Sequence, residues 1–79
     1  MNLTTASPTD TATALTAGAP TSILVSAGCV RVEVKDADDA WQAIEDVTPP
    51  GITIPVLPGT AVRGTLIQGE AATVTITQG

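Results

Sequence analysis

The stretch that decides the fold is residues 28–47, GCVRVEVKDADDAWQAIEDV. Over 29–35 valine alternates with charged residues, so a strand here has one apolar face and one charged face. Asp36, Asp38 and Asp39 follow, and aspartate favours turns because its short side chain accepts hydrogen bonds from nearby backbone amides. The stretch therefore predicts a β-hairpin, with its bend at the aspartates and its second strand beyond them.

The second half of this hairpin begins at Trp41, the sole aromatic residue of the chain. The segment at 41–47 fits the periodicity of a strand and also that of a helix, because Trp41, Ile44 and Val47 match one face of a helix. The segment is short for a helix in a β-rich chain, and Pro49 and Pro50 close it sharply. A return strand over 41–46 is therefore favoured.

Four further segments alternate in the same way, at 21–27, 52–57, 60–67 and 71–77. Gly28 separates 21–27 from the valine strand, a spacing that predicts a hairpin or a bulged meander. Pro55 cannot donate a hydrogen bond to a ladder, so the segment at 52–57 is expected at a sheet edge or bulged. Short strands with frequent turn signals predict an all-β fold, a small antiparallel sandwich or barrel of about six or seven strands.

The interior of this fold is predicted to be aliphatic, with one indole. Its members are the apolar residues on one face of each strand, namely Ile23, Val25, Val30, Val32, Val34, Trp41, Ile54, Val56, Val62, Leu66, Val74 and Ile76.

Residues 1–19 consist mainly of threonine, alanine and serine. They carry few large apolar groups, so by themselves they cannot offset the entropy lost on ordering. We expect an extended N-terminal arm that is flexible or is ordered by a partner, followed by a β-module over 20–79. Leu15 could then join the edge of a partner's sheet by strand addition.

Size and charge restrict the classes of function. A chain of 79 residues forms one domain at most and buries a marginal core, which favours self-association. Cys29 is the only cysteine and there is no histidine, so an intrachain disulfide and a zinc site of histidine and cysteine are excluded. The net charge of −5 argues against binding to nucleic acid or to an acidic membrane. No apolar run approaches the length of a membrane span, and no secretory signal is expected.

The residues also give no support for catalysis, cofactors or metals. Without histidine or tyrosine the usual nucleophile and base pairs are missing, so the protein is not expected to be an enzyme. Asp36, Asp38 and Asp39 could offer oxygen ligands to calcium, but the later glycine and glutamate of an EF-hand loop are absent, which favours a solvated turn. The same turn with Trp41 faintly resembles the aspartate-box hairpin of sialidase propellers, without the glycine of that box, so no function is transferred.

The whole profile resembles the small structural proteins of tailed bacteriophages. The resemblance rests on a short acidic β-module, the Thr/Ala/Ser-rich arm, the absence of histidine, and strands such as GITIPVLPGTAVRGTLIQGEAATVTITQG at 51–79. Capsid decoration (cement) proteins and tail or fibre adaptor proteins are similar to it in style. The resemblance implies a virion protein, assembled in the host cytoplasm, that binds the major capsid or tail protein as a homo-oligomer, a trimer being favoured.

Two functions are therefore carried forward. The first is a capsid decoration protein, with a phage tail or fibre component as its near alternative. The second is a carbohydrate- or surface-binding module that uses Trp41 and the acidic turn. Interface candidates are taken from the arm, the expected edge strand and the exposed strand faces: Leu15, Thr53, Pro55, Leu57, Arg63 and Trp41.

Overall fold

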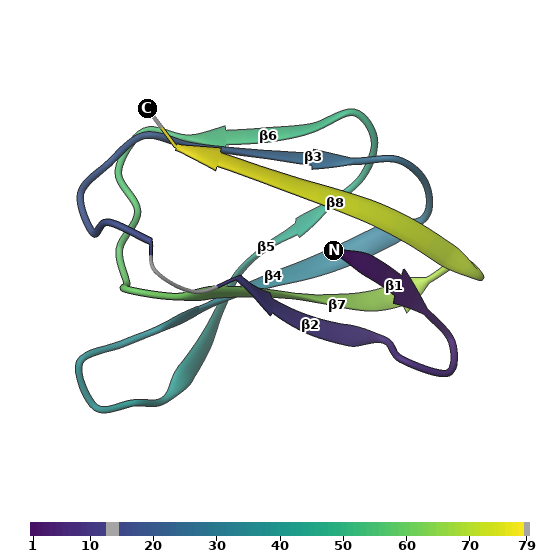
Figure 1. Cartoon of the computed structure of the whole chain (residues 1–79), viewed down its shortest axis with the longest axis horizontal. Coiled ribbons are helices and arrows are strands. Elements are labelled where there is room, and N and C mark those ends of the chain that lie inside the picture. The colour runs from purple at the N-terminus through teal and green to yellow at the C-terminus, as the bar shows by residue number, and fades with distance from the viewer. Residues whose placement is uncertain (13–14, 79) are drawn as a thin grey trace.

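Eight strands form two four-stranded antiparallel sheets that pack face to face (Figure 1). The computed structural model describes residues 1–12 and 15–78, and no helix occurs in this part of the chain. Sheet 1 has the order β1-β8-β3-β6 and sheet 2 the order β2-β7-β4-β5. The strands are β1 (Asn2–Thr4), β2 (Thr9–Ala12), β3 (Thr21–Val25), β4 (Cys29–Lys35), β5 (Trp41–Val47), β6 (Gly51–Ile54), β7 (Val62–Gln68) and β8 (Ala71–Gln78).

This architecture confirms the all-β sandwich predicted from the sequence, with eight strands in place of about six or seven. None of the described segments is a helix long and apolar enough to cross a membrane. The additional strands are β1 and β2, which lie in the region expected to be an arm.

The hairpin predicted around the aspartates is present as β4 and β5. The segment after the bend is a strand, and it runs to Val47, one residue beyond the expected end. A bulge follows Val32, and β5 forms an edge of sheet 2. Figure 1 shows the bend of this hairpin extending beyond the rest of the sandwich, which explains why only Val47 of β5 is fully buried.

The connection between β3 and β4 is not the hairpin or meander that the sequence predicts. β3 pairs with β6 and β8 in sheet 1, whereas β4 pairs with β5 and β7 in sheet 2. Gly28 makes the crossover possible, because its φ of +70° lies in the left-handed region. A Cβ atom at Gly28 would lie 2.3 Å from the carbonyl oxygen of Gln68, so no other residue fits there without movement.

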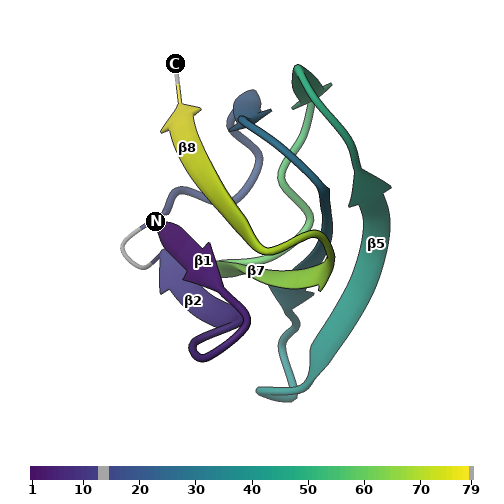
Figure 2. The same cartoon turned by 90° about the vertical axis from the view of Figure 1, so that its right-hand side faces the viewer.

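Residues 1–12 differ most from expectation, because they belong to the sandwich and not to a separate arm. β1 pairs with β8 at the edge of sheet 1, and β2 pairs with β7 at the edge of sheet 2. Figures 1 and 2 show the two strands side by side at one corner. Leu3 is fully buried, and its Cδ1 atom lies near the backbone of Gly64 in β7. Gly64 leaves the space that Leu3 fills, and β7 and β8 supply the hydrogen-bonding partners that a free arm lacks.

The expected boundary at residue 19 is also absent from the described chain. Leu15 packs, partly buried, against the core. The backbone N–H of Gly18 donates to the carbonyl of Leu57 at 3.0 Å, and the N–H of Leu57 donates to the carbonyl of Ala19 at 3.2 Å. Thr13 and Ala14, which fall within the expected arm, lie outside the described residues.

The core between the sheets is aliphatic, as predicted, but its membership differs. The prediction that Val56 belongs to the core is wrong, since 61% of this residue is exposed. Trp41, also predicted in the core, is only partly buried. β6 ends at Ile54, so the alternation stops at Pro55 and Leu57 points inward in place of Val56. Ile54 and Ile76 pack partly buried against the core. The buried residues are Leu3, Ile23, Val25, Val30, Val32, Val34, Val47, Leu57, Val62, Leu66, Ala72 and Val74.

Candidate interaction surfaces

The outer faces of the two sheets differ in charge. The chain has eight acidic and three basic residues, and none of them lies in the four described strands of sheet 1. All three basic residues lie in β4 and β7 of sheet 2. The acidic residues lie in strands of sheet 2, in the β4–β5 turn or in the β7–β8 turn. We call the outer face of sheet 1 the uncharged face and that of sheet 2 the charged face.

Side chains with hydroxyl groups dominate the uncharged face. The register places Ser22 between Thr53 and Thr77, and Leu24 beside Thr75. Ser22 Oγ lies 3.4 Å from Thr53 Oγ1 in an exposed hydrogen bond. Leu24 differs from these hydroxyl-bearing neighbours, because it is a large apolar residue and 52% of it is exposed on the same face.

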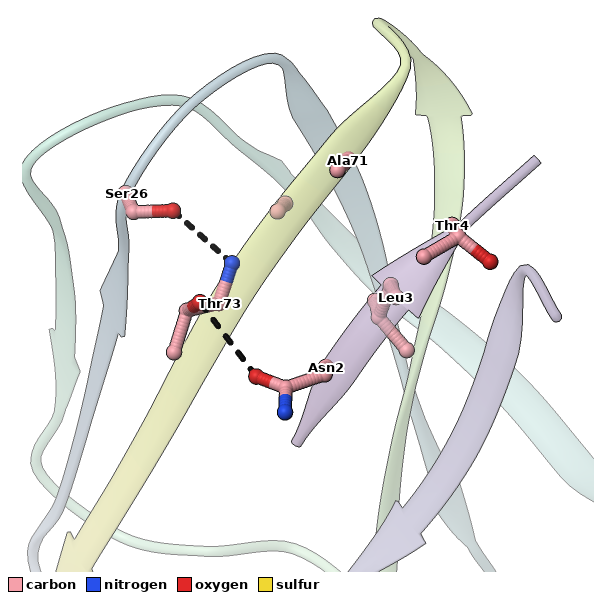
Figure 3. Close-up of a pocket in the computed structure, with 7 residues that line it drawn as sticks. Asn2, Leu3, Thr4, Ser26, Ala71 and Thr73 are labelled. Atoms are coloured by element: carbon pink, nitrogen blue, oxygen red, sulfur yellow. Dashed lines mark hydrogen bonds between the residues drawn. The ribbon is translucent and has the colours of Figure 1, made fainter.

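A shallow hollow of about 220 Å³ opens on the uncharged face where β8 begins (Figure 3). The small, exposed side chain of Ala71 leaves this space on β8, whereas Ala72, which also lines it, is buried toward the core. Thr73 joins the two sides of the hollow, Ser26 after β3 and Asn2 in β1. Its N–H donates to Ser26 Oγ at 2.8 Å, and its hydroxyl donates to Asn2 Oδ1 at 3.4 Å. The lining residues are Asn2, Leu3, Thr4, Ser26, Ala71, Ala72 and Thr73.

The charged face contains ion pairs between neighbouring strands. Arg63 in β7 donates from Nε to Glu33 Oε1 at 2.9 Å and from Nη2 to Oε2 at 3.2 Å. This hydrogen-bonded guanidinium lowers the pKa of the Glu33 carboxyl. Arg31 makes a similar but exposed pair with Asp46, at 3.0 Å from Nε to Oδ1, which raises the pKa of Arg31.

Trp41 lies on this charged face and not in the core as predicted. The five-residue bend of Asp36–Ala40 sets Trp41 opposite Lys35, on the charged side of β4. The guanidinium carbon of Arg63 lies 4.6 Å from the centre of the indole ring, in cation–π geometry. Arg63 therefore covers one face of the ring while the residue stays partly exposed.

The acidic turn is held by a single carboxylate. Asp36 Oδ1 accepts hydrogen bonds from the N–H groups of Asp38 at 2.8 Å and Ala40 at 3.0 Å, and Oδ2 accepts one from Gln42 Nε2 at 3.1 Å. The two backbone donors, that of Ala40 foremost, lower the pKa of Asp36. These contacts support the solvated turn that the sequence favours. Across 1–12 and 15–78 no three histidine, cysteine, aspartate or glutamate side chains are grouped as metal ligands.

The interface candidates do not form one patch. Leu57 is buried in the core, so it is excluded as a surface contact, and Leu15 is partly buried. Thr53 and Pro55 are exposed in and after β6 of sheet 1, whereas Arg63 and Trp41 belong to sheet 2. Sequence reasoning missed Leu24, although its position between Ser22 and Ser26 on one face of TSILVSA (21–27) was the signal.

Comparisons with protein families, curated proteins and solved structures found no match. The two outer faces and the β4–β5 hairpin are therefore the features on which a functional proposal can rest. Of these, the uncharged face is the largest departure from an ordinary solvated surface, which usually mixes charges of both signs.

Proposed function

We propose that the protein is a non-enzymatic structural protein of a virion, which decorates and stabilises the capsid of a tailed bacteriophage as a homo-oligomer. The observation that carries the proposal is the uncharged, hydroxyl-rich face of sheet 1. The style of the sequence, which resembles phage decoration proteins, supplies the biological setting.

The uncharged face has the physical properties of an attachment surface. Burying a charged side chain costs several kcal/mol unless it is paired, and this face has none to bury. Threonine side chains are stiff at χ1 and their hydroxyls both donate and accept, so they lose little entropy and adapt to many partners. The charged face stays available to water, which keeps a decorated particle soluble.

The test is whether the protein is part of purified particles. Phage particles from cells that carry the gene are separated on a density gradient, and each fraction is probed with an antibody against this protein. We expect it to migrate with the major capsid protein at a constant ratio that survives repeated washing. Recovery only in the low-mass fractions would contradict the virion role.

A pair of variants with the same charge change links attachment to one face. Thr75→Glu places a carboxylate on the uncharged face, and Ala37→Glu places one at the exposed β4–β5 turn. We expect Thr75→Glu to be lost from particles and Ala37→Glu to be retained. Equal retention of both variants would show that attachment uses another surface.

The carbohydrate-binding alternative rests on Trp41, which is partly exposed on the surface. Stacking of a sugar requires a free ring face, and Arg63 occupies one of the two. Titration of the intact protein with glycans, read by tryptophan fluorescence, separates the two functions. A saturable change in emission that is lost in Trp41→Leu would favour the alternative.

A further inference from the structure

We propose that the uncharged face of sheet 1 packs against the same face of a second copy of this chain, with Leu24 of each copy seated in the hollow over Ala71 and Ala72 of the other. The proposal concerns self-association alone, and it does not depend on the virion role. It uses the face to which the proposed function assigns attachment, so the pair describes the free protein, and attachment to a capsid would exchange the second copy for the shell.

The distribution of charge favours this face for contact between identical copies. Each copy has a net charge of −5, and its charged side chains all lie in sheet 2 or in the turns after β4 and β7. Two copies that meet through sheet 1 keep the charged residues of sheet 2 and of the β4–β5 turn on opposite outer sides of the pair, where water and salt screen them. Glu70, which precedes Ala71, lies nearer to the contact. Contact through sheet 2 would instead bring two acidic hairpins together.

Hydrogen bonding on this face is self-complementary. A hydroxyl group donates and accepts, so a surface of threonine and serine can pair with an identical surface. A surface of one charge sign cannot do so. Two sheets that pack face to face place their layers about 10 Å apart, with side chains of both faces interdigitating.

Leu24 and the hollow provide matching shapes at two separate places on the face. Leu24 projects with 52% exposure, and its neighbour on β6 is Gly51, which has no side chain to cover it. The hollow measures about 220 Å³, and the exposed Ala71 contributes a small apolar side chain to its lining. Leu24 pairs with Thr75, four residues along β8 from Ala71, which corresponds to about 14 Å.

A two-fold axis midway between these places sets each Leu24 over the hollow of the other copy. Such an axis generates a closed pair, because the same patch is used on both subunits. The inference therefore favours a dimer, or an assembly of dimers, over the trimer that the phage resemblance implies.

The first experiment measures molar mass by light scattering over a dilution series. We expect the unmodified protein to be a dimer that dissociates on dilution, and Leu24→Asp to raise the dissociation constant about 100-fold or more by burying a carboxylate. Ile67→Asp is the matched control, since Ile67 is 42% exposed on the charged face. Circular dichroism of both variants verifies that each one is folded.

The second experiment traps the contact with a disulfide. In a Cys29→Ser background, Leu24→Cys and Ala71→Cys are combined in one chain, where the two positions are too far apart to join within one copy. Under mild oxidation we expect a covalent dimer, and the single variants should give much less. The same pair of cysteines built at Ile67 of β7 and at Ala37 of the β4–β5 turn should remain monomeric on denaturing gels.

Three results would overturn the proposal. They are a monomer at every concentration, a dimer that Ile67→Asp disrupts and Leu24→Asp does not, and a failure of the paired cysteines to cross-link while the protein is dimeric. The virion role fails separately: a dimer that is absent from particles contradicts that role and leaves the interface intact. A protein that is monomeric in free solution at every concentration yet is bound to particles contradicts the interface and leaves attachment to the virion intact.

Discussion

The two sheets share one aliphatic core but present opposite surfaces. Sheet 2 holds Arg63, Glu33, Arg31 and Asp46 in pairs across neighbouring strands, whereas the described strands of sheet 1 have only uncharged residues. Both inner faces alternate in the same way, so the core does not require this difference. The comparison teaches that the fold constrains one side of each sheet and leaves the other side free for function.

The largest effect is expected at Leu3 of sheet 1, which packs against Gly64 of sheet 2. Leu3→Ala removes a fully buried group that fills the space over Gly64, so the free energy of unfolding should fall by about 3 kcal/mol. Chemical denaturation measures the change. Val56→Ala is the control, and its exposed side chain predicts a small effect. Equal effects of both variants would mean that residues 1–12 form a free arm after all.

A substitution at Gly51 tests whether the backbone of β6, the edge strand of sheet 1, can move to accept a side chain. Its φ is +130°, and an added Cβ would lie 2.0 Å from the carbonyl oxygen of Ile23. Gly51→Ala should therefore cost about 2 kcal/mol or more in thermal unfolding. Gly18→Ala serves for comparison, because it shares a positive φ of 83° but meets nothing within 4 Å. A cost at Gly51 no greater than at Gly18 would indicate that β6 relaxes freely.

A difference between the sheets in pH dependence is expected from the Glu33–Arg63 pair. Because the pKa of Glu33 is lowered on folding, its ion pair stabilises the protein above the ordinary glutamate pKa of about 4.3 and is lost as pH falls through the lower folded value. Glu33→Gln should cost about 1 kcal/mol near neutral pH and progressively less in acid.

The matched variant for this prediction lies on sheet 1. Thr75→Val changes an exposed residue whose sheet has no carboxylate side chain in its strands, so its effect on unfolding should be constant from pH 7 to strongly acidic solution. Denaturation of each variant over the pH range measures both curves. If the stability changes of Glu33→Gln and Thr75→Val varied with pH in the same way, the Glu33–Arg63 pair would not be the source of a pH dependence specific to sheet 2.

The smallest effect is expected at Arg31 and Asp46, which form an exposed pair. Arg31→Gln should leave the unfolding midpoint nearly unchanged at physiological salt, because solvent and ions screen such pairs. Measurement at low and high salt checks this prediction. A large loss of stability that salt does not alter would assign Arg31 a packing role.

Much of the fold could be predicted from local patterns. The valine alternation of β4, the aspartate bend and the edge position of β6 all follow from rules that act within a few residues. The segments at 21–27, 52–57 and 71–77 contain no charged residue, but that they belong to one sheet was not predicted. Leu24 shows the limit of such local rules, since it alternates with Ser22 and Ser26 yet is not among the residues that the sequence predicts at an interface.

The features that could not be predicted depend on partners distant in sequence. The burial of Leu3 depends on the space above Gly64, some sixty residues away, and on the free edge of β8. Trp41 was assigned to the core because large rings are usually buried, yet the length of the bend fixed it opposite Lys35. Leu57 replaced Val56 because β6 ended before Pro55.

The one-sided placement of charge gives the protein an electric dipole that runs across its two layers. On a positively charged bead or sensor the molecules would adsorb through sheet 2 and the acidic hairpin, with sheet 1 directed toward solution. The single lysine, Lys35, lies on that same side, so a label on its amine also stays away from sheet 1. Copies immobilised below the dissociation constant of the pair would therefore be uniformly oriented, with the uncharged face open to a second copy or to another partner.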